Sequence, residues 1–261
     1  MDVMQALLVG GGAFLAGGMN AMAGGGTFFS FPALLAAGVP PVMANASNSV
    51  AMWPASLSSA WAYRREVSRH PRWTLLLVLL SFVGGIAGGL LLLATSNAAF
   101  ARLVPWLLLV ATGLFAFSGQ VSRLVGAARS RLGLKRRADG TPGGVGGLLF
   151  QLCVAIYGGF FGAGMGILTL AALAIQGVDD IQELNGLKNL TSAVNYTVAA
   201  ATFIVAGAIS WPHTLLMIVT AMIGALAGSA LARRLPALWL KRLVVAVGAT
   251  LSVIYFFKTY S

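Results

Sequence analysis

The sequence predicts an all-α polytopic membrane protein made of two inverted-topology repeats, each with a broken or re-entrant opening helix pair and three transmembrane helices. Hydrophobic residues make up 58% of the 261 residues and charged residues only 9%, with a mean hydropathy of +0.87. Soluble domains do not have this balance. Because the apolar runs lack the alternation of β-barrel strands, we expect roughly eight to ten helical segments.

The apolar runs follow one another along the whole chain. A helix of about 20 residues, rising 1.5 Å per residue, crosses a hydrocarbon core about 30 Å thick. The opening run of the first half is too long for one span and scarcely long enough for two, which predicts two shortened helices or a re-entrant hairpin. The runs cover approximately residues 5–37, 42–62, 73–94, 103–121, 146–176, 184–207, 214–232 and 239–257.

An internal repeat divides the chain into two halves. The stretch "FLAGGMNAMAGGGTFFSFPALLAAGVPPVMANASNSV" aligns with "AIYGGFFGAGMGILTLAALAIQGVDDIQELNGLKNLT", so that Gly17 matches Gly158 and Asn45 matches Asn185. Repeats of this length indicate two related structural units. We therefore predict a first transmembrane repeat over residues 1–122, a basic cytoplasmic linker over 123–145 and a second transmembrane repeat over 146–261.

Basic residues are concentrated in loops. Fourteen of the 17 Lys and Arg residues lie in the three stretches 64–72, 123–137 and 233–242. Short loops rich in Lys and Arg mark the cytoplasmic side of a membrane, so the net charge of +11 indicates topology and not nucleic-acid binding. We expect a multi-pass protein of the plasma (inner) membrane, with the lipid bilayer as its surroundings.

The same charges predict how the two halves are oriented. The basic loop precedes the segment that begins at Trp73, whereas it follows the matching segment that begins at Trp211. The matching segments are therefore expected to cross in opposite directions, which places both chain termini outside the cell. Inverted repeats with interrupted opening helices are typical of secondary transporters, which bind substrate where the repeats meet.

Glycines at the two predicted helix breaks are candidate substrate ligands. A break followed by a short apolar helix exposes free backbone N–H groups and the positive end of the helix dipole, which together suit an anion. Close packing of neighbouring backbones is the alternative role for these residues. The candidates are Gly24, Gly25, Gly26 and Thr27 in the first half and Gly162, Gly164 and Gly166 in the second.

Polar residues beyond each break form a second candidate set. They recur at helical spacing, and Lys188 is the basic residue that lies inside an apolar segment away from its ends. A substrate cavity is one interpretation, and the alternatives are interhelical hydrogen bonds for the asparagines and snorkelling for the lysine. The set comprises Asn45, Asn48 and Ser49 in the first half and Asn185, Lys188, Asn189 and Ser192 in the second.

The remaining reactive residue types are scarce. One cysteine, Cys153, and two histidines in predicted loops give no metal site, and no cofactor is expected. The six acidic residues lie at predicted segment ends or loops, so no mid-membrane carboxylate suggests proton coupling. With no set of residues typical of catalysis, the sequence does not predict an enzyme.

The motifs "GGGTFFSFPALLAAGVPP", "ANASNS" and "GAGMGILTLAAL…LNGLKNLTSAVN…ISW" resemble those of the sulfite exporter TauE/SafE family of membrane permeases. The resemblance covers essentially the whole chain. It implies a permease for a small anion: sulfite, an organosulfonate, or a related sulfur-containing or organic anion. We expect alternating access with the site at the glycine-rich breaks; an anion channel and a non-transporting membrane assembly factor are the alternatives.

Overall fold

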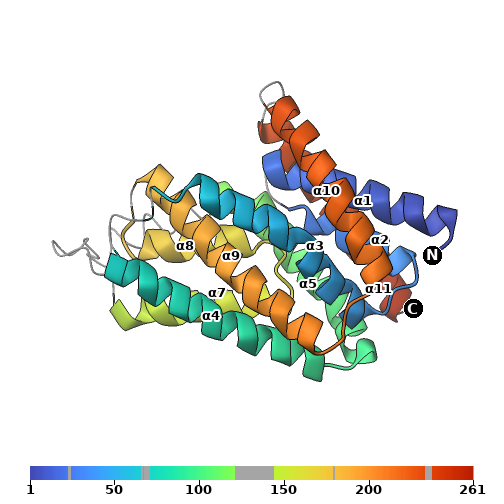
Figure 1. Cartoon of the computed structure of the whole chain (residues 1–261), viewed down its shortest axis with the longest axis horizontal. Helices are drawn as coiled ribbons and strands as arrows, with labels where there is room; N and C mark the ends of the chain where they lie inside the picture. Colours follow the sequence, from blue (N-terminus) through green and yellow to red (C-terminus); the bar gives the residue numbers. More distant parts are fainter. Residues whose placement is uncertain are drawn as a thin grey trace.

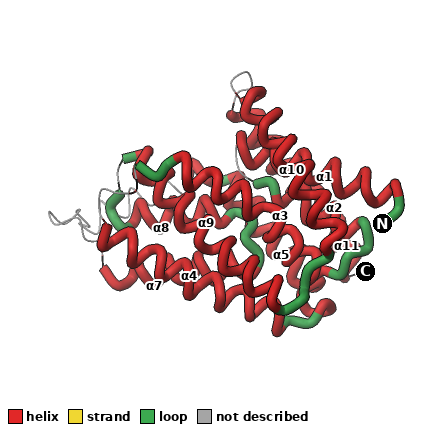
Figure 2. The backbone as a smooth tube through the Cα atoms, viewed as in Figure 1, coloured by secondary structure: helices red, strands yellow, loops and turns green. Residues whose placement is uncertain are grey.

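The computed structural model describes residues 1–22, 25–65, 67, 71–120, 144–178, 180–232 and 237–260. Over these residues the regular secondary structure is helical, with no strand (Figure 2). The first half contains α1 (Val3–Met22), α2 (Thr27–Ala36), α3 (Pro41–Ala62), α4 (Pro71–Ala94) and α5 (Asn97–Ala116). The second half contains α7 (Gly144–Phe160), α8 (Met165–Ile175), α9 (Ile181–Val205), α10 (Trp211–Ala232) and α11 (Ala237–Tyr260).

The all-helical membrane fold predicted from the sequence is confirmed. Within the described residues, five helices are long and apolar enough to cross a bilayer: α1, α4, α5, α10 and α11. Helices α2, α7 and α8 are apolar but shorter. The predicted linker 123–145 lies outside the described residues, apart from the first two residues of α7.

Both opening segments are broken at their glycines, as expected. Helix α1 ends at Met22 and the short helix α2 begins at Thr27. In the second half, α7 ends at Phe160 and α8 begins at Met165. Each half therefore has the same order of an opening helix, a short helix of 10 or 11 residues and three helices of at least 20 residues.

The helices of one half pack mainly against those of the other (Figure 1). Helix α1 packs along α10, and its counterpart α7 packs along α4, the counterpart of α10. The central contacts join α3 to α9 and α5 to α11, which are matching helices of the two halves. If each helix is replaced by its counterpart in the other half, the same helix pairs result. The packing of the helices therefore follows the internal repeat.

Glycines allow these long helices to approach closely. A Cβ added to Gly224 of α10 would clash with the carbonyl oxygen of Phe14 in α1. At the matching interface, a Cβ on Gly88 of α4 would clash with the carbonyl oxygen of Ile156 in α7. Backbone-to-backbone contact through small residues is how transmembrane helices associate without a hydrophobic driving force.

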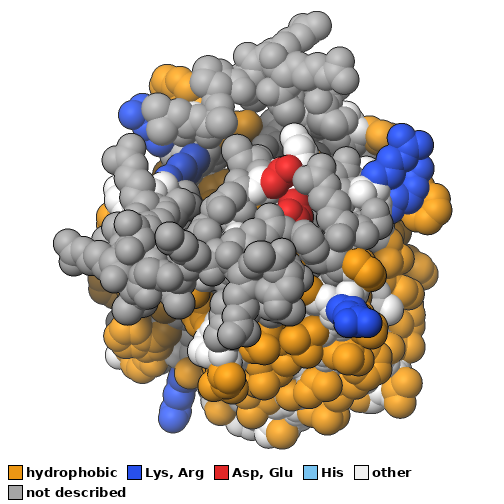
Figure 3. Space-filling model, turned by 90° about the vertical axis from the view of Figure 1, so that its left-hand side faces the viewer, with side chains coloured by type: hydrophobic (Ala, Val, Ile, Leu, Met, Phe, Trp, Pro, Cys, Tyr) orange, Lys and Arg blue, Asp and Glu red, His pale blue; other side chains and the backbone are white. Residues whose placement is uncertain are grey.

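The outer surface is apolar along its flanks and basic at one end. Large hydrophobic side chains such as Leu79 and Val83 of α4 and Leu226 of α10 are exposed on the outer face. Figure 3 shows hydrophobic side chains covering the flank, with Lys and Arg side chains around the end that lies at the left of Figure 1. This is the distribution expected for helices surrounded by lipid.

Candidate functional site

A cavity of about 380 Å³ lies where the two helix breaks face each other. Residues of both breaks line it, together with side chains from α3, α5 and α9. The lining combines backbone at the starts of α2 and α8 with polar side chains from α9. Among the described lining residues there is one cationic side chain, Lys188, and no carboxylate.

The first-half break contributes the residues around the start of α2. Gly25 has φ +83°, a left-handed conformation that L side chains rarely adopt, so this turn requires glycine. Gly26 and Thr27 follow it and also line the cavity. Gly24, the remaining candidate of this group, lies outside the described residues.

The second-half break is built on two left-handed glycines. Gly162 has φ +80° and Gly164, the N-cap of α8, has φ +77°. The N–H groups of Met165 and Ile167 donate to the carbonyl oxygens of Gly162 and Gly164, at 3.2 and 3.0 Å. Among the described residues no backbone carbonyl accepts the N–H of Gly166, which also lines the cavity. The start of α8 thus offers a donor beside the cavity, as helix N-termini generally do.

One face of α9 supplies the polar side chains. Lys188, Asn189 and Ser192 all line the cavity, and Tyr196 continues the face one turn further along the helix. A Cβ added to Gly166 would lie 3.7 Å from Cδ of Lys188, so the lysine stem passes beside the start of α8. The sequence interpretation of Lys188 as a cavity residue therefore agrees with its position.

Tyr196 was missed by the sequence interpretation. Its side chain lines the cavity together with Thr27, so the polar face of α9 and the start of α2 border the same space. The spacing of four residues from Ser192 is the signal that could have found it, because that spacing keeps side chains on one helix face.

Four of the candidate residues do not line the cavity: Asn45, Asn48, Ser49 and Asn185. The side chains of the first three are buried and hydrogen-bonded within the protein. The Asn45 amide nitrogen donates to the carbonyl oxygen of Phe160 at 2.8 Å, and the Ser49 hydroxyl donates to the carbonyl oxygen of Asn45 at 3.0 Å. The Ser30 hydroxyl donates to the Asn48 side-chain oxygen at 2.5 Å. The contacts of Asn45 and Asn48 fit the interhelical alternative, whereas the Ser49 bond lies within α3.

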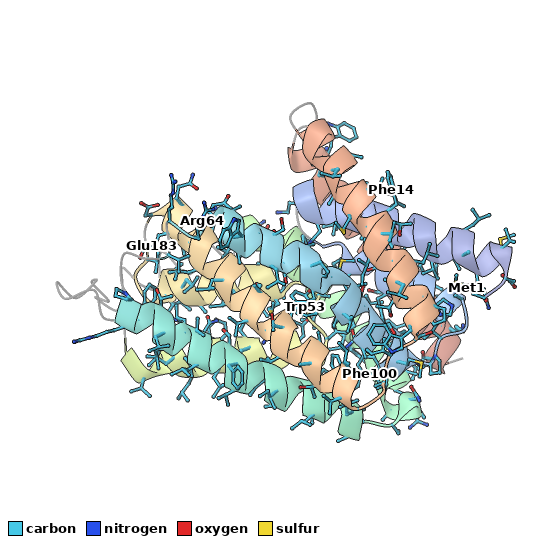
Figure 4. All side chains as sticks on the ribbon, in the orientation of Figure 1. Met1, Phe14, Trp53, Arg64, Phe100 and Glu183 are labelled. Carbon is cyan, nitrogen blue, oxygen red and sulfur yellow. The ribbon has the colours of Figure 1, made fainter. Side chains whose placement is uncertain are left out.

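The cavity is open toward one end of the molecule. Asn20 of α1 and Ser59 of α3 line it and are exposed, and Ser59 lies in the last turn of α3, five residues before Arg64. Figure 4 shows Arg64 at one end of the fold and Phe100 at the other, with Trp53 between them. Access from the surface is therefore at the end of α3 that carries Arg64.

Phenylalanines close the other end of the space between the breaks. Phe31 of α2 meets Phe161 of the second break edge-to-face, with ring centroids 5.5 Å apart. Phe100, at the start of α5, contacts Phe160 in the same way at 5.6 Å. Phe31, Phe100 and Phe161 are fully or almost fully buried. The phenylalanine cluster, comprising these four residues, is therefore a dry seal of interlocking rings.

Comparison with known proteins gives one family for nearly the whole chain. A family model described as "Sulfite exporter TauE/SafE" matches residues 9–255. Two similar proteins are a probable membrane transporter protein of Haemophilus influenzae, 28% identical over 217 residues (83% of this chain, 80% of the relative), and the probable membrane transporter protein YfcA of Escherichia coli K12, 28% identical over 247 residues (92% and 85%).

A third relative, the probable membrane transporter protein ORF9 of Sinorhizobium sp, is 28% identical over 249 residues, covering 92% of this chain and 88% of the relative. No solved structure significantly matches the chain. The three relatives share a description as transporters, and the matches extend over both repeats.

Proposed function

Since the chain belongs to the sulfite exporter TauE/SafE family, a family of membrane permeases, we propose that it moves a small anion across the plasma (inner) membrane through the cavity between the helix breaks. The substrate would be sulfite, an organosulfonate, or a related sulfur-containing or organic anion. Its ligands would come from the starts of α2 and α8 and from the polar face of α9.

The observation that carries this proposal is the meeting of two helix starts and one lysine at a single cavity without a carboxylate among its described lining residues. Helix N-termini attract anions through unpaired N–H groups and the helix dipole. Lys188 adds a full positive charge, and an ionisable group within a membrane indicates function by default. Asn189, Ser192 and Tyr196 can donate hydrogen bonds to oxyanion oxygens.

The dimensions favour a small substrate. A volume of about 380 Å³ is near the lower end of the range for small-molecule sites, which runs from about 300 to 1,000 Å³. The lining also contains apolar side chains, such as Met52, Phe115 and Leu170, beside the polar groups. A short organosulfonate would place its oxyanion on the donors and its carbon chain against these side chains.

The proposed mechanism is alternating access, supported by the contrast between the two ends of the site. The cavity opens toward Arg64, whereas the phenylalanine cluster fills the space at the opposite end. Both the cavity and the seal contain residues of each half, so a movement of one half relative to the other would alter them together. Assigning the basic end to the cytoplasm makes the described state inward-open.

Counterflow in proteoliposomes tests the carrier against a channel. With a panel of sulfite, sulfonates and carboxylates as labelled substrates, we expect preloading with unlabelled substrate to accelerate uptake of the labelled form. A channel would instead give macroscopic current with no acceleration by preloading. Absence of both flux and binding for the whole panel would overturn the permease proposal for these substrates.

A further inference from the structure

A second buried polar site lies next to the anion cavity, between α4 of the first half and helices of the second half. Side chains of α4, α7, α8 and α9 surround a gap that is too small to admit a water molecule. Its polar members are all buried, with exposed fractions of 1 or 2%. They are Ser81, Gln151, Thr169, Thr191 and Asn195, called here the oxygen cluster.

The Asn195 side chain lines this gap and has an acceptor without a partner among the described residues. Its Nδ2 donates to the carbonyl oxygens of Ala155 at 2.7 Å and Ser81 at 3.4 Å, which fixes the orientation of the amide. Its Oδ1 has no hydrogen-bond partner in the described part of the chain. A buried amide with both donor directions used and its oxygen free presents only negative partial charge to the gap.

Three further oxygens of the oxygen cluster behave in a similar way. Gln151 Oε1 and Ser81 Oγ are buried and have no partner within the described residues. The Thr191 hydroxyl directs its hydrogen to the backbone, with carbonyl oxygens of Leu187 at 2.8 Å and Lys188 at 3.1 Å, so its lone pairs remain free. Buried polar groups in native proteins nearly always have a partner, so this many unpaired acceptors around one gap indicates a missing ligand.

The repeated fold does not itself require these side chains. In the alignment of the halves, Gln151 corresponds to Gly10, and Thr191 and Asn195 correspond to Ala51 and Ala55. The first half forms the same helices with residues that have no polar side chain at these three positions. These three side chains are therefore additions to the second half, as Lys188 is, whereas Ser81 comes from α4 of the first half.

We propose that the oxygen cluster binds a dehydrated Na⁺ ion. The free groups are hard, neutral oxygen acceptors, which bind a small hard cation and repel an anion. No carboxylate lines the gap among the described residues, and divalent cations in proteins are generally held by carboxylates. Exclusion of water favours a bare ion that is smaller than a water molecule. Transporters hold Na⁺ beside interrupted helices through backbone carbonyl oxygens, and here side-chain oxygens next to the start of α8 would take that role.

The position of the oxygen cluster links it to the anion cavity. Met165, the first residue of α8, lines both spaces. Thr191 and Asn195 directly precede Ser192 and Tyr196, which line the anion cavity from the adjacent side of α9. A bound cation would therefore order the helix face that carries the anion ligands and attract the anion. This coupling rests on the proposed function, whereas the Na⁺ site itself does not.

Binding is tested with purified protein and no anionic substrate. We expect ²²Na⁺ to bind in equilibrium dialysis, and NaCl to raise the apparent melting temperature in a concentration-dependent way that choline chloride at equal ionic strength does not reproduce. Ser81→Ala and Gln151→Leu should each raise the half-saturating Na⁺ concentration at least tenfold. Ser252→Ala is the matched control, because that buried hydroxyl of α11 bonds to Gly248 of its own helix.

Equal melting temperatures in NaCl and choline chloride, together with no bound ²²Na⁺, would overturn the site. The site would also be overturned if Ser252→Ala weakened Na⁺ binding as much as Ser81→Ala does. Replacing external Na⁺ with choline in the flux assay then tests the coupling, and we expect a lower initial rate. Unchanged flux with intact ²²Na⁺ binding would overturn the coupling but not the Na⁺ site. Because ²²Na⁺ binding is measured without an anionic substrate, a failure of the permease proposal can be distinguished from a failure of the ion site.

Discussion

Asn45, near the start of α3 in the first half, donates its side-chain amide to the carbonyl oxygen of Phe160, the last residue of α7 in the second half, at 2.8 Å. The Asn45 side chain is fully buried. The bond satisfies a carbonyl at the point where α7 ends and its own helical hydrogen bonds run out. A side chain of the first half therefore stabilises the helix break of the second half.

Asn45→Ala should lower stability because it leaves the partly buried Phe160 carbonyl oxygen without its partner. The expected loss is about 1 kcal/mol, the usual net contribution of a hydrogen bond. It would be measured as a decrease in the apparent melting temperature of the purified protein in detergent.

Ser49→Ala provides the comparison for Asn45→Ala. Ser49 is equally buried, but its hydroxyl donates within α3 to the carbonyl oxygen of Asn45. Its removal should therefore cost much less than removal of the bond between the halves. A melting temperature for Asn45→Ala no lower than that for Ser49→Ala would argue against the importance of the Asn45–Phe160 bond.

Lys188→Gln should weaken binding of the anionic substrate while leaving expression and folding intact. Glutamine keeps most of the length and the hydrogen-bonding ability but removes the charge. A hydrogen bond to a charged group contributes about 1.5–3 kcal/mol, which corresponds to roughly a 10- to 100-fold rise in the apparent Kd. Binding of the transported anion to purified protein measures this directly.

Lys258→Gln is the matched charge change, because Lys258 lies exposed in the last turn of α11, away from the cavity. We expect its anion affinity to equal that of the unmodified protein. If Lys188→Gln also retained full affinity, Lys188 would have no role as an anion ligand, and snorkelling of its ammonium toward the interface would account for it.

More of the fold than of the candidate site could be predicted from the sequence. Hydropathy and glycine positions were enough for the helical class and the two breaks, because membranes admit few other spanning structures. The cavity residues on α9 were found in part, because spacing predicts a shared helix face. Spacing does not predict which way that face turns, and so Asn45 and Asn185 were grouped with Lys188 although they do not line the cavity. Rotation about a helix axis depends on packing partners, which a single sequence does not reveal.

Gly164→Ala should disturb the start of α8, because φ is +77° at this position and an L side chain is strained there. The cost of a left-handed non-glycine residue is about 1–2 kcal/mol. Since Gly164 lines the cavity, the altered turn should also weaken anion binding. Both effects can be measured on one purified sample, by thermal unfolding and by binding.

Gly113→Ala is the control for the glycine substitution. Gly113 lies inside α5, and an added Cβ would have no atom within 4 Å. Alanine favours helix over glycine by up to about 1 kcal/mol, so this variant should be as stable as the unmodified protein or more so. A Gly164→Ala protein with unchanged melting temperature and affinity would contradict the proposed role of the left-handed turn.

The inverted orientation of the halves can be tested by thiol labelling in intact cells. The exposed Cys153 would first be replaced by serine, and Arg72→Cys and Arg242→Cys would then be introduced one at a time. If both basic ends face the cytoplasm, neither cysteine should react with an impermeant external reagent. Ala94→Cys, at the other end of the helix that begins beside Arg72, should react and serves as the positive control. Labelling of Arg242→Cys but not Arg72→Cys would indicate that the halves run in parallel, and the alternating-access proposal would then lose its symmetry argument.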